Sequence, residues 1–224
     1  DDGIDILVDL SGHTGASRLP LFARRLAPVQ ATWLGYLNTT GLAAMDYLIA
    51  DEVAVPPADG PHFTETVARL PHSFLCFRPP PSVPEVRNPP CLSGDAITFG
   101  CFNNTAKLSR QVISVWAEIM RRVPNARIHL KCRIDTKGES EYYGGLFADY
   151  GIGGDRVIFT KYLPRDRYYD EFAKLDIALD PFPYNGGTTT IDTLWMGIPV
   201  VSLRGNRYLS RLGASILTTV GMEE

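Results

Sequence analysis

Two glycines and three threonines stand where a predicted strand turns into a predicted helix, in the segment 180–192, DPFPYNGGTTTID. The apolar run 177–179 before it predicts a buried strand, and 191–196 predicts a short helix that ends at Gly197 and Pro199. The start of a helix presents unpaired backbone N–H groups at the positive end of its dipole. Glycine permits close approach and threonine adds a hydroxyl, so the segment suits an anion, most often a phosphate. A simple helix cap with a glycine turn would use the same residues.

Other polar residues are expected at the same edge of the molecule. Asn104 and Lys107 follow the predicted strand 96–102, and Arg165 and Tyr168 follow a later strand. In a parallel sheet the loops after the strands share one edge, where ligands bind. The segment is neither a P-loop nor a dinucleotide fingerprint, because it has no Gly-Lys-Ser/Thr and the chain has no G-x-G-x-x-G.

The combination of residue types favours a nucleotide diphosphate as the ligand. A lysine and a helix start with threonines, as at Lys107 and 188–190, meet a diphosphate. An aromatic ring such as Tyr168 stacks on a base, and a carboxylate such as Asp192 accepts hydrogen bonds from ribose hydroxyls. Taken singly, Lys107 fits a solvated surface lysine, Tyr168 fits half-buried packing, and Asp192 fits a charge that complements the helix dipole.

Strand and helix patterns alternate along the chain, which predicts parallel sheets with helices on both faces. The predicted strands are 4–10, 30–36, 47–50, 96–102, 127–132, 157–160, 176–179 and 200–203, with a short extended piece at 73–77. The predicted helices are 19–26, 63–70, 109–123, 142–150, one that begins at 164, 191–196 and 208–220. Ser109 is the expected cap of the strongest amphipathic helix.

Six prolines between residues 79 and 90 predict a stiff connection between two domains. We therefore expect a first domain over 1–92 that ends in the proline-rich linker 79–92, and a second domain over 93–224. The chain starts almost directly in a strand and has no initiator Met, so we expect it to be part of a longer protein.

The composition is that of an ordinary globular protein, with 45% hydrophobic and 21% charged residues. A net charge of −3 predicts no nucleic-acid partner, and no apolar run is long enough to cross a membrane. The four cysteines lack C-x-x-C pairing and histidines at metal spacing, so we expect reduced thiols, no metal site and a cytoplasmic protein.

Several segments resemble the catalytic region of the O-linked N-acetylglucosamine transferases, especially the SPINDLY branch and its bacterial relatives. They are 33–36 (WLGY), 99–107 (FGCFNNTAK) and 180–190, with further likeness at 9–14 and 73–77. The resemblance implies a GT-B glycosyltransferase, an α/β protein with parts of two Rossmann-like domains. It implies an inverting, metal-independent and cofactor-free transfer of a sugar from UDP-N-acetylglucosamine to Ser or Thr of acceptor proteins. Tetratricopeptide repeats are expected in the full-length parent, and the isolated chain is expected to be inactive.

The resemblance also assigns roles to residues that contact the nucleotide. Lys107 matches the lysine that stabilises the leaving diphosphate, and Asn104 matches a neighbouring polar position. Thr188 and Thr189 match diphosphate-binding threonines, and Asp192 matches the carboxylate near the ribose. Arg165 matches a position near the ribose, and Tyr168 matches the position that stacks on the base. Leu34 and Gly35 match positions whose backbone contacts the donor sugar.

Some positions depart from the animal transferases. Gly187, beside the expected diphosphate, replaces a histidine, and Glu171 replaces an arginine near the base, which puts uridine specificity in doubt. His13 and Tyr184 are candidate substrate contacts, although a turn-stabilising role is the favoured interpretation of His13.

Two alternatives to an N-acetylglucosamine transferase stay open, and a third is disfavoured. A SPINDLY-like protein O-fucosyltransferase would use GDP-fucose instead. A catalytically incomplete nucleotide-binding or interaction module would bind nucleotide without transferring sugar. A dinucleotide-dependent oxidoreductase is disfavoured, because its fingerprint is missing.

Overall fold

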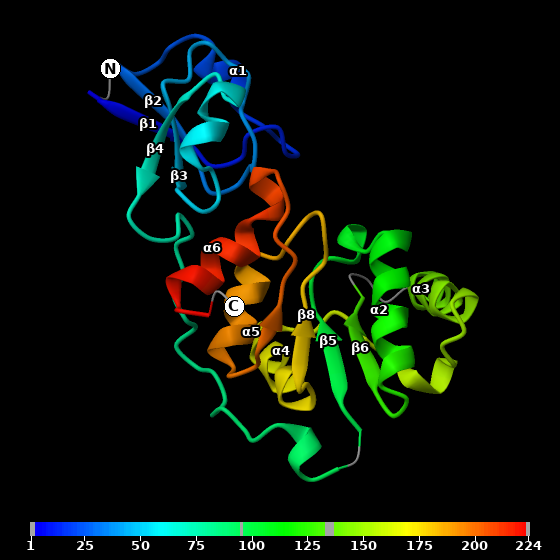
Figure 1. Ribbon diagram of the computed structural model, residues 1–224. Helices are drawn as coiled ribbons and strands as arrows, with labels where there is room; N and C mark the ends of the chain where they lie inside the picture. The colour runs from blue at the N-terminus through cyan, green and yellow to red at the C-terminus, as the bar shows by residue number, and fades with distance from the viewer. Residues whose placement is uncertain (1–2, 95, 133–136, 223–224) are drawn as a thin grey trace. The chain divides into compact units, whose positions relative to one another are not determined.

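The computed structural model describes residues 3–94, 96–132 and 137–222, with the side chains of Lys137, Arg165 and Asp166 outside the description. The chain forms two compact units. Unit 1 comprises Asp1–Cys76 and Arg204–Glu224, and unit 2 comprises Phe77–Leu203 (Figure 1). Each unit contains its own parallel sheet, so the α/β expectation holds for both.

Unit 1 is built on a four-stranded sheet in the order β1-β2-β3-β4, with every neighbouring pair parallel. Its strands are β1 (Ile6–Asp9), β2 (Val29–Trp33), β3 (Tyr47–Asp51) and β4 (Thr66–Leu70). Its helical elements are α1 (Leu19–Phe22), η1 (Pro57–His62), η6 (Tyr208–Ser210) and α6 (Leu212–Thr219).

The last helix closes the core of unit 1. Tyr208 and Leu212 pack with Leu48 and Phe74 in one buried cluster. The buried carboxylate of Asp51 joins distant parts of the chain, since it accepts hydrogen bonds from the Phe74 N–H at 2.9 Å and the Ser215 hydroxyl at 2.7 Å.

One face of the unit 1 sheet is open along β1. Ile4, Ile6, Val8 and Leu10 occupy alternate positions, which place their side chains on one face. These four side chains are between 38% and 61% exposed. Parallel sheets are normally covered on both faces, so this apolar stripe is an unusual surface for a protein.

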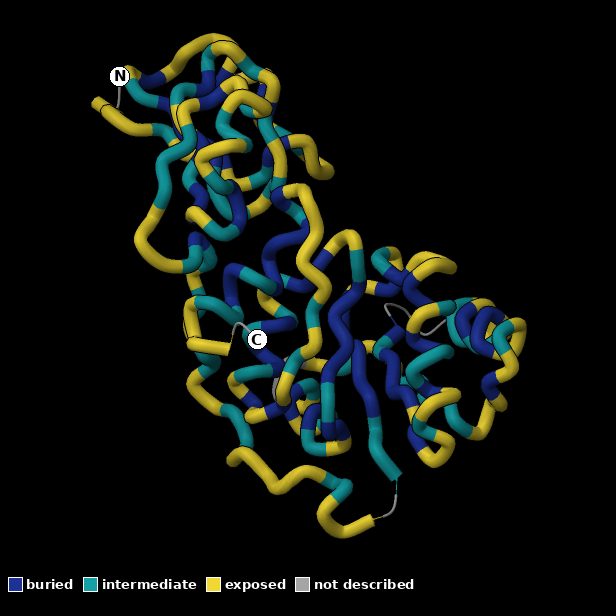
Figure 2. The backbone as a smooth tube through the Cα atoms, viewed as in Figure 1, coloured by how far each residue is buried: buried dark blue, intermediate teal, exposed yellow. Residues whose placement is uncertain are grey.

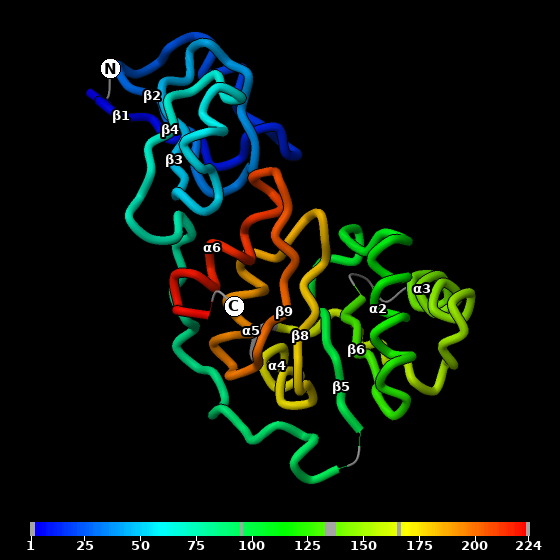
Figure 3. The backbone as a smooth tube through the Cα atoms, in the orientation of Figure 1, coloured from blue at the N-terminus to red at the C-terminus, as the bar shows by residue number. Residues whose placement is uncertain are grey.

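Unit 2 contains a five-stranded parallel sheet in the order β7-β6-β5-β8-β9. Its strands are β5 (Thr98–Cys101), β6 (Arg127–Lys131), β7 (Val157–Thr160), β8 (Ile177–Leu179) and β9 (Val200–Val201). Its helices are α2 (Arg110–Arg122), α3 (Lys137–Asp149), α4 (Arg165–Tyr168) and α5 (Thr188–Trp195), with short 3₁₀ segments η2 (Pro90–Leu92), η3 (Thr105–Lys107), η4 (Gly154–Arg156) and η5 (Tyr169–Lys174). Figure 3 shows β9, β8 and β5 side by side.

Helices cover both faces of the unit 2 sheet, as expected. The cluster on one face contains Trp116 and Met120 of α2 and Phe147 of α3. The cluster on the other contains Phe172 of η5 and Met196 at the end of α5. Figure 2 shows the central strands of this sheet as the most deeply buried part of the unit.

The expected cap of α2 is confirmed, because the Ser109 hydroxyl accepts a hydrogen bond from the Val112 N–H at 3.3 Å. The helix expected over 63–70 is wrong. Residues Thr66–Leu70 form β4 and pair with β3 along their whole length. Threonine and valine in this run favour a strand, and pairing with β3 outweighs the weak helical pattern.

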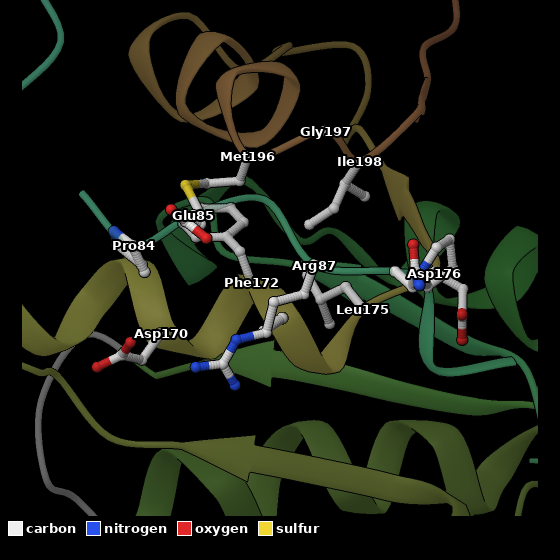
Figure 4. Close-up of a pocket in the computed structure, with 13 residues that line it drawn as sticks. Pro84, Glu85, Arg87, Asp170, Phe172, Leu175, Asp176, Met196, Gly197 and Ile198 are labelled. Atoms are coloured by element: carbon white, nitrogen blue, oxygen red, sulfur yellow. The ribbon is translucent and has the colours of Figure 1, made fainter. Parts of the chain in front are cut away.

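The division between units differs from the expected boundary near residue 92. The proline-rich segment belongs to unit 2, and 204–224 return to unit 1. The segment is held there because Cys91 donates its N–H to the Asp176 carboxylate at 2.8 Å, and the same carboxylate accepts from the Thr98 N–H of β5 at 2.8 Å. Figure 4 shows a small hollow beneath it, where Pro84 and Arg87 face η5 and the end of α5.

Candidate functional site

The start of α5 carries unpaired backbone donors. Gly187 is the N-cap and offers no side-chain acceptor. Among the described residues, no acceptor pairs with the N–H groups of Thr188, Thr189 or Thr190. The helix therefore begins at the carboxyl end of β8 with the anion-binding arrangement that the sequence predicts.

A buried carboxylate shapes the loop that leads into α5. Asp180 accepts hydrogen bonds from the Gly186 N–H and the Ser202 hydroxyl, both at 2.6 Å. Burial raises the pKa of Asp180 to about 6, while these hydrogen bonds and Lys107 oppose the rise. Gly186 leaves no room for a side chain unless its neighbours move, because a Cβ there would lie 2.4 Å from the Thr190 hydroxyl oxygen. Sequence reasoning missed Asp180 as a site residue, although its place directly after the strand was visible.

Lys107 lies against the same loop. It ends η3, the 3₁₀ turn after β5, and its Nζ donates to the Asn185 carbonyl at 2.7 Å. The ammonium also lies 4.1 Å from the centre of the Tyr184 ring, which is 45% exposed. Burial lowers the pKa of Lys107, and the charge of Asp180 partly opposes this. The lysine of one loop and the helix start of another are thus neighbours, as expected.

Asn103 contacts Lys107, although the sequence singles out Asn104. Asn104 is exposed and caps η3, because its Oδ1 accepts from the Ala106 N–H at 3.0 Å. Asn103 is buried instead, and its Oδ1 lies 3.5 Å from the Lys107 Nζ. A cap at Asn104 turns its side chain back onto its own loop, so Asn103 is the asparagine that contacts the lysine.

Asn185, the residue before Gly186, has an orphan polar atom. It is fully buried, and its Nδ2 donates to the Pro181 carbonyl at 3.0 Å. Among the described residues, its Oδ1 is the buried side-chain atom that has no hydrogen-bond partner. Unpaired buried oxygens are costly, so this one fits a loop that rearranges around a ligand.

Asp192 and Tyr168 are engaged with other residues of unit 2. Asp192 is buried, and its Oδ1 accepts a hydrogen bond from the Tyr169 hydroxyl at 2.7 Å. The Tyr168 ring packs against the rings of Tyr169 and Phe172, with centroids 5.3 and 5.0 Å away, and burial raises the pKa of its hydroxyl. The ammonium of Lys131 lies 4.3 Å from the centre of its ring. A base can stack on Tyr168 only where Lys131 leaves a face uncovered.

Arg165 begins α4, but its side chain lies outside the described residues. The remaining candidates lie in unit 1. Leu34 follows β2 with a positive φ of 69°, and a Cβ at Gly35 would lie 1.8 Å from the Leu10 carbonyl oxygen. His13 Nε2 forms a hydrogen bond with the Thr40 carbonyl at 2.8 Å. These contacts hold the turns of unit 1, which agrees with the turn-stabilising reading of His13.

A buried polar cluster lies beneath the site and was not expected from the sequence. His129 of β6 is buried against the Thr160 hydroxyl, and burial lowers its pKa to about 4. The Glu171 carboxylate accepts from Thr160 at 3.1 Å and pairs with Lys174 at 2.6 Å. Within the described part of the chain, no group of three or more His, Cys, Asp or Glu residues could hold a metal ion.

Comparison with known proteins identifies the family. A model of glycosyl transferase family 41 matches residues 1–77 and 82–224. The chain belongs to this family. It is 41% identical over 224 residues to the Arabidopsis thaliana "Probable UDP-N-acetylglucosamine--peptide N-acetylglucosaminyltransferase SPINDLY", covering 99% of the chain and 24% of that protein. It is 30% identical over 230 residues to the similarly named SEC of the same plant, covering 99% of the chain and 23% of that protein.

Among solved structures, a lysine-to-methionine mutant of the Thermobaculum terrenum O-GlcNAc transferase matches with a TM-score of 0.94 and 39% identity. The match covers 99% of this chain and 42% of that one. The family 41 chain therefore has the GT-B fold class, represented by two parallel sheets. It spans about a quarter of the length of its curated relatives. No helix in the described ranges is long and apolar enough to cross a membrane.

Proposed function

We propose that the chain provides the nucleotide-sugar site of a protein O-glycosyltransferase, which moves a sugar to Ser or Thr hydroxyls of acceptor proteins. The observation that carries the proposal is the position of the Lys107 ammonium, 2.7 Å from the Asn185 carbonyl and beside the unpaired start of α5. Two independent sources of positive potential meet there, which is what a leaving diphosphate requires.

The proposed reaction is a single displacement with inversion. The acceptor oxygen attacks the anomeric carbon and loses its proton, while the bond from that carbon to the diphosphate oxygen breaks with its electron pair. Lys107 and the N–H groups of Thr188 and Thr189 stabilise the negative charge that grows on the diphosphate. We propose that these donors replace the metal ion that other glycosyltransferases use for the same charge.

The first candidate donor is UDP-N-acetylglucosamine, which appears in the names of the plant relatives SPINDLY and SEC. A guanine donor, as in GDP-fucose, is a second candidate, and Glu171 favours it. The side chain of Glu171 is 13% exposed, lies three residues after Tyr168 in η5, and presents a carboxylate that pairs with Lys174 and accepts a hydrogen bond from Thr160. Guanine offers two adjacent N–H donors to a carboxylate, whereas uracil offers a single N–H between two carbonyl oxygens.

The test is sugar transfer by the full-length protein with both donors, in wild type and in Lys107→Met. We expect turnover to fall about a hundredfold to a thousandfold, because one charged donor to the leaving group is lost. Arg127→Met, at the exposed start of β6 on the opposite edge of the unit 2 sheet, is the control and should retain activity. Near-wild-type turnover in Lys107→Met would exclude the assignment.

A catalytically incomplete module remains the competing function. It predicts calorimetric binding of UDP or GDP by the full-length protein without transfer of either sugar.

We further propose a cytoplasmic protein with tetratricopeptide repeats in its longer form. The thiols of Cys101 and Cys132 are buried and free, which is usual in a reducing compartment.

A further inference from the structure

Lys131 is a second lysine at the edge of the unit 2 sheet. It ends β6, and its side chain is partly buried. The Nζ lies 4.3 Å from the centre of the Tyr168 ring. Within the described parts of the chain, the ammonium has neither a hydrogen-bond acceptor nor a carboxylate at ion-pair distance.

The partly buried ammonium of Lys131 contacts the face of an aromatic ring, which leaves its N–H donors without hydrogen-bond acceptors among the described residues. Its three N–H donors need acceptors, and a cation–π contact supplies attraction but no hydrogen bond. Burial lowers the pKa of Lys131, and the charge of Asp192 partly opposes this. The environment therefore leaves the lysine short of an oxygen acceptor, which a ligand can bring.

The position of Lys131 relates it to the nucleoside end of the site. The ring of Tyr168, which it covers, lies 5.3 Å from the ring of Tyr169, and the Tyr169 hydroxyl donates a hydrogen bond to Asp192 of α5 at 2.7 Å. Lys131 is thus linked through two tyrosines to Asp192, the carboxylate that we expect near the ribose. Lys107, by contrast, contacts the loop before α5.

We propose that Lys131 binds the nucleobase of the donor by donating a hydrogen bond to its carbonyl oxygen. The inference rests on the proposed function and deepens it. The ligand class is a base with a carbonyl at this edge, either uracil through O4 or guanine through O6. Adenine carries an amino group at the equivalent position, so Lys131 selects against adenine nucleotides.

The protein-side test is calorimetric binding of UDP, GDP, ADP and pyrophosphate to the full-length protein. In Lys131→Met we expect the preferred carbonyl-bearing nucleotide to bind about tenfold to a hundredfold more weakly, the range for a hydrogen bond to a charged group. Binding of ADP and pyrophosphate should be unchanged. Lys131→Arg keeps a charged donor and should recover most of the loss. Arg127→Met, at the other end of β6, is the control.

The ligand-side test uses nucleotides in which sulfur replaces the carbonyl oxygen, 4-thio-UDP and 6-thio-GDP. Sulfur accepts hydrogen bonds poorly, so wild type should bind the thio analogue more weakly than its parent nucleotide. Lys131→Met should show no such difference. The analogue that reveals the effect identifies the base.

Two results would overturn the inference while wild type still binds UDP or GDP. One is unchanged affinity of Lys131→Met for both nucleotides. The other is an equal loss for pyrophosphate, which would assign Lys131 to the diphosphate. Wild type that binds no nucleotide at all would overturn the proposed function together with this inference. Matching melting temperatures for wild type and Lys131→Met exclude an effect through folding.

Discussion

At the residue scale, the site depends on groups whose chemistry the sequence showed only in part. Lys107 and the threonines of α5 were found because strand-to-loop positions in a parallel sheet share one edge. Asn103, Asp180 and Lys131 were missed. The parts that we assign to them depend on side-chain orientation and burial. Neither property produces a periodic pattern in the sequence at a single loop position.

Asp180 should make stability depend on pH in a defined direction. Its pKa rises from an ordinary 3.8 to about 6 on folding, so the folded state favours the protonated carboxyl. Protonated Asp180 therefore contributes its full stabilisation of the fold below about pH 4. This stabilisation is lost as the pH rises through 6, so the free energy of unfolding should fall by roughly 3 kcal/mol. Urea denaturation of wild type and Asp180→Asn between pH 4 and 7 checks this. The fall should be absent in the variant, and an equal fall in both proteins would contradict the account.

Gly186 should tolerate no side chain. In Gly186→Ala the new Cβ would lie 2.4 Å from the Thr190 hydroxyl and 2.9 Å from the Asn103 amide, so we expect lower stability and weaker nucleotide binding. Overpacking of this kind typically costs about 1–3 kcal/mol. Gly145→Ala, in the exposed middle of α3 with open space around it, should instead add about 0.5–1 kcal/mol. Thermal unfolding of both variants checks the pair, and equal effects would contradict it.

At the element scale, secondary structure was predicted correctly where the hydrophobic periodicity was strong and wrongly where it was weak. The helix α2 was predicted to within a residue, because its apolar face and its cap agree. The run Thr66–Leu70 has no such agreement, and pairing with β3 decides that it is a strand. The proline-rich segment was predicted as a linker from composition, but its hydrogen bonds to Asp176 attach it to unit 2.

The cap of α2 offers a test at this scale. Ser109→Ala removes the acceptor for the Val112 N–H and should lower the free energy of unfolding by about 1 kcal/mol. Ser114 lies inside the same helix, and its hydroxyl donates to the Gln111 carbonyl. Ser114→Ala should therefore be neutral or slightly stabilising. Chemical denaturation measures both, and a cost at Ser114 as large as that at Ser109 would contradict the capping argument.

At the scale of the whole molecule, the chain crosses from unit 1 to unit 2 and back again. The return of 204–224 was not predictable from local patterns, because the contact of Asp51 with Ser215 joins residues far apart in the chain. The two parallel sheets themselves were predicted, since alternating strands and helices allow few other arrangements.

The open apolar stripe of β1 should make the 224-residue chain self-associate when it is produced alone. Replacing Ile6 and Val8 together by Lys removes two exposed apolar side chains and should reduce self-association and the binding of hydrophobic dyes. Val115→Lys, at an exposed valine of α2, is the control and should change neither. Light scattering at several concentrations checks this, and identical scattering of the double variant and wild type would contradict it.

The most direct test of the central claim is a crystal structure of the full-length protein with UDP or GDP. We predict that the diphosphate accepts hydrogen bonds from the N–H groups of Thr188 and Thr189 at the start of α5, with the Lys107 ammonium moved from the Asn185 carbonyl onto a phosphate oxygen. Phosphates bound elsewhere, with Lys107 still on that carbonyl, would contradict the account.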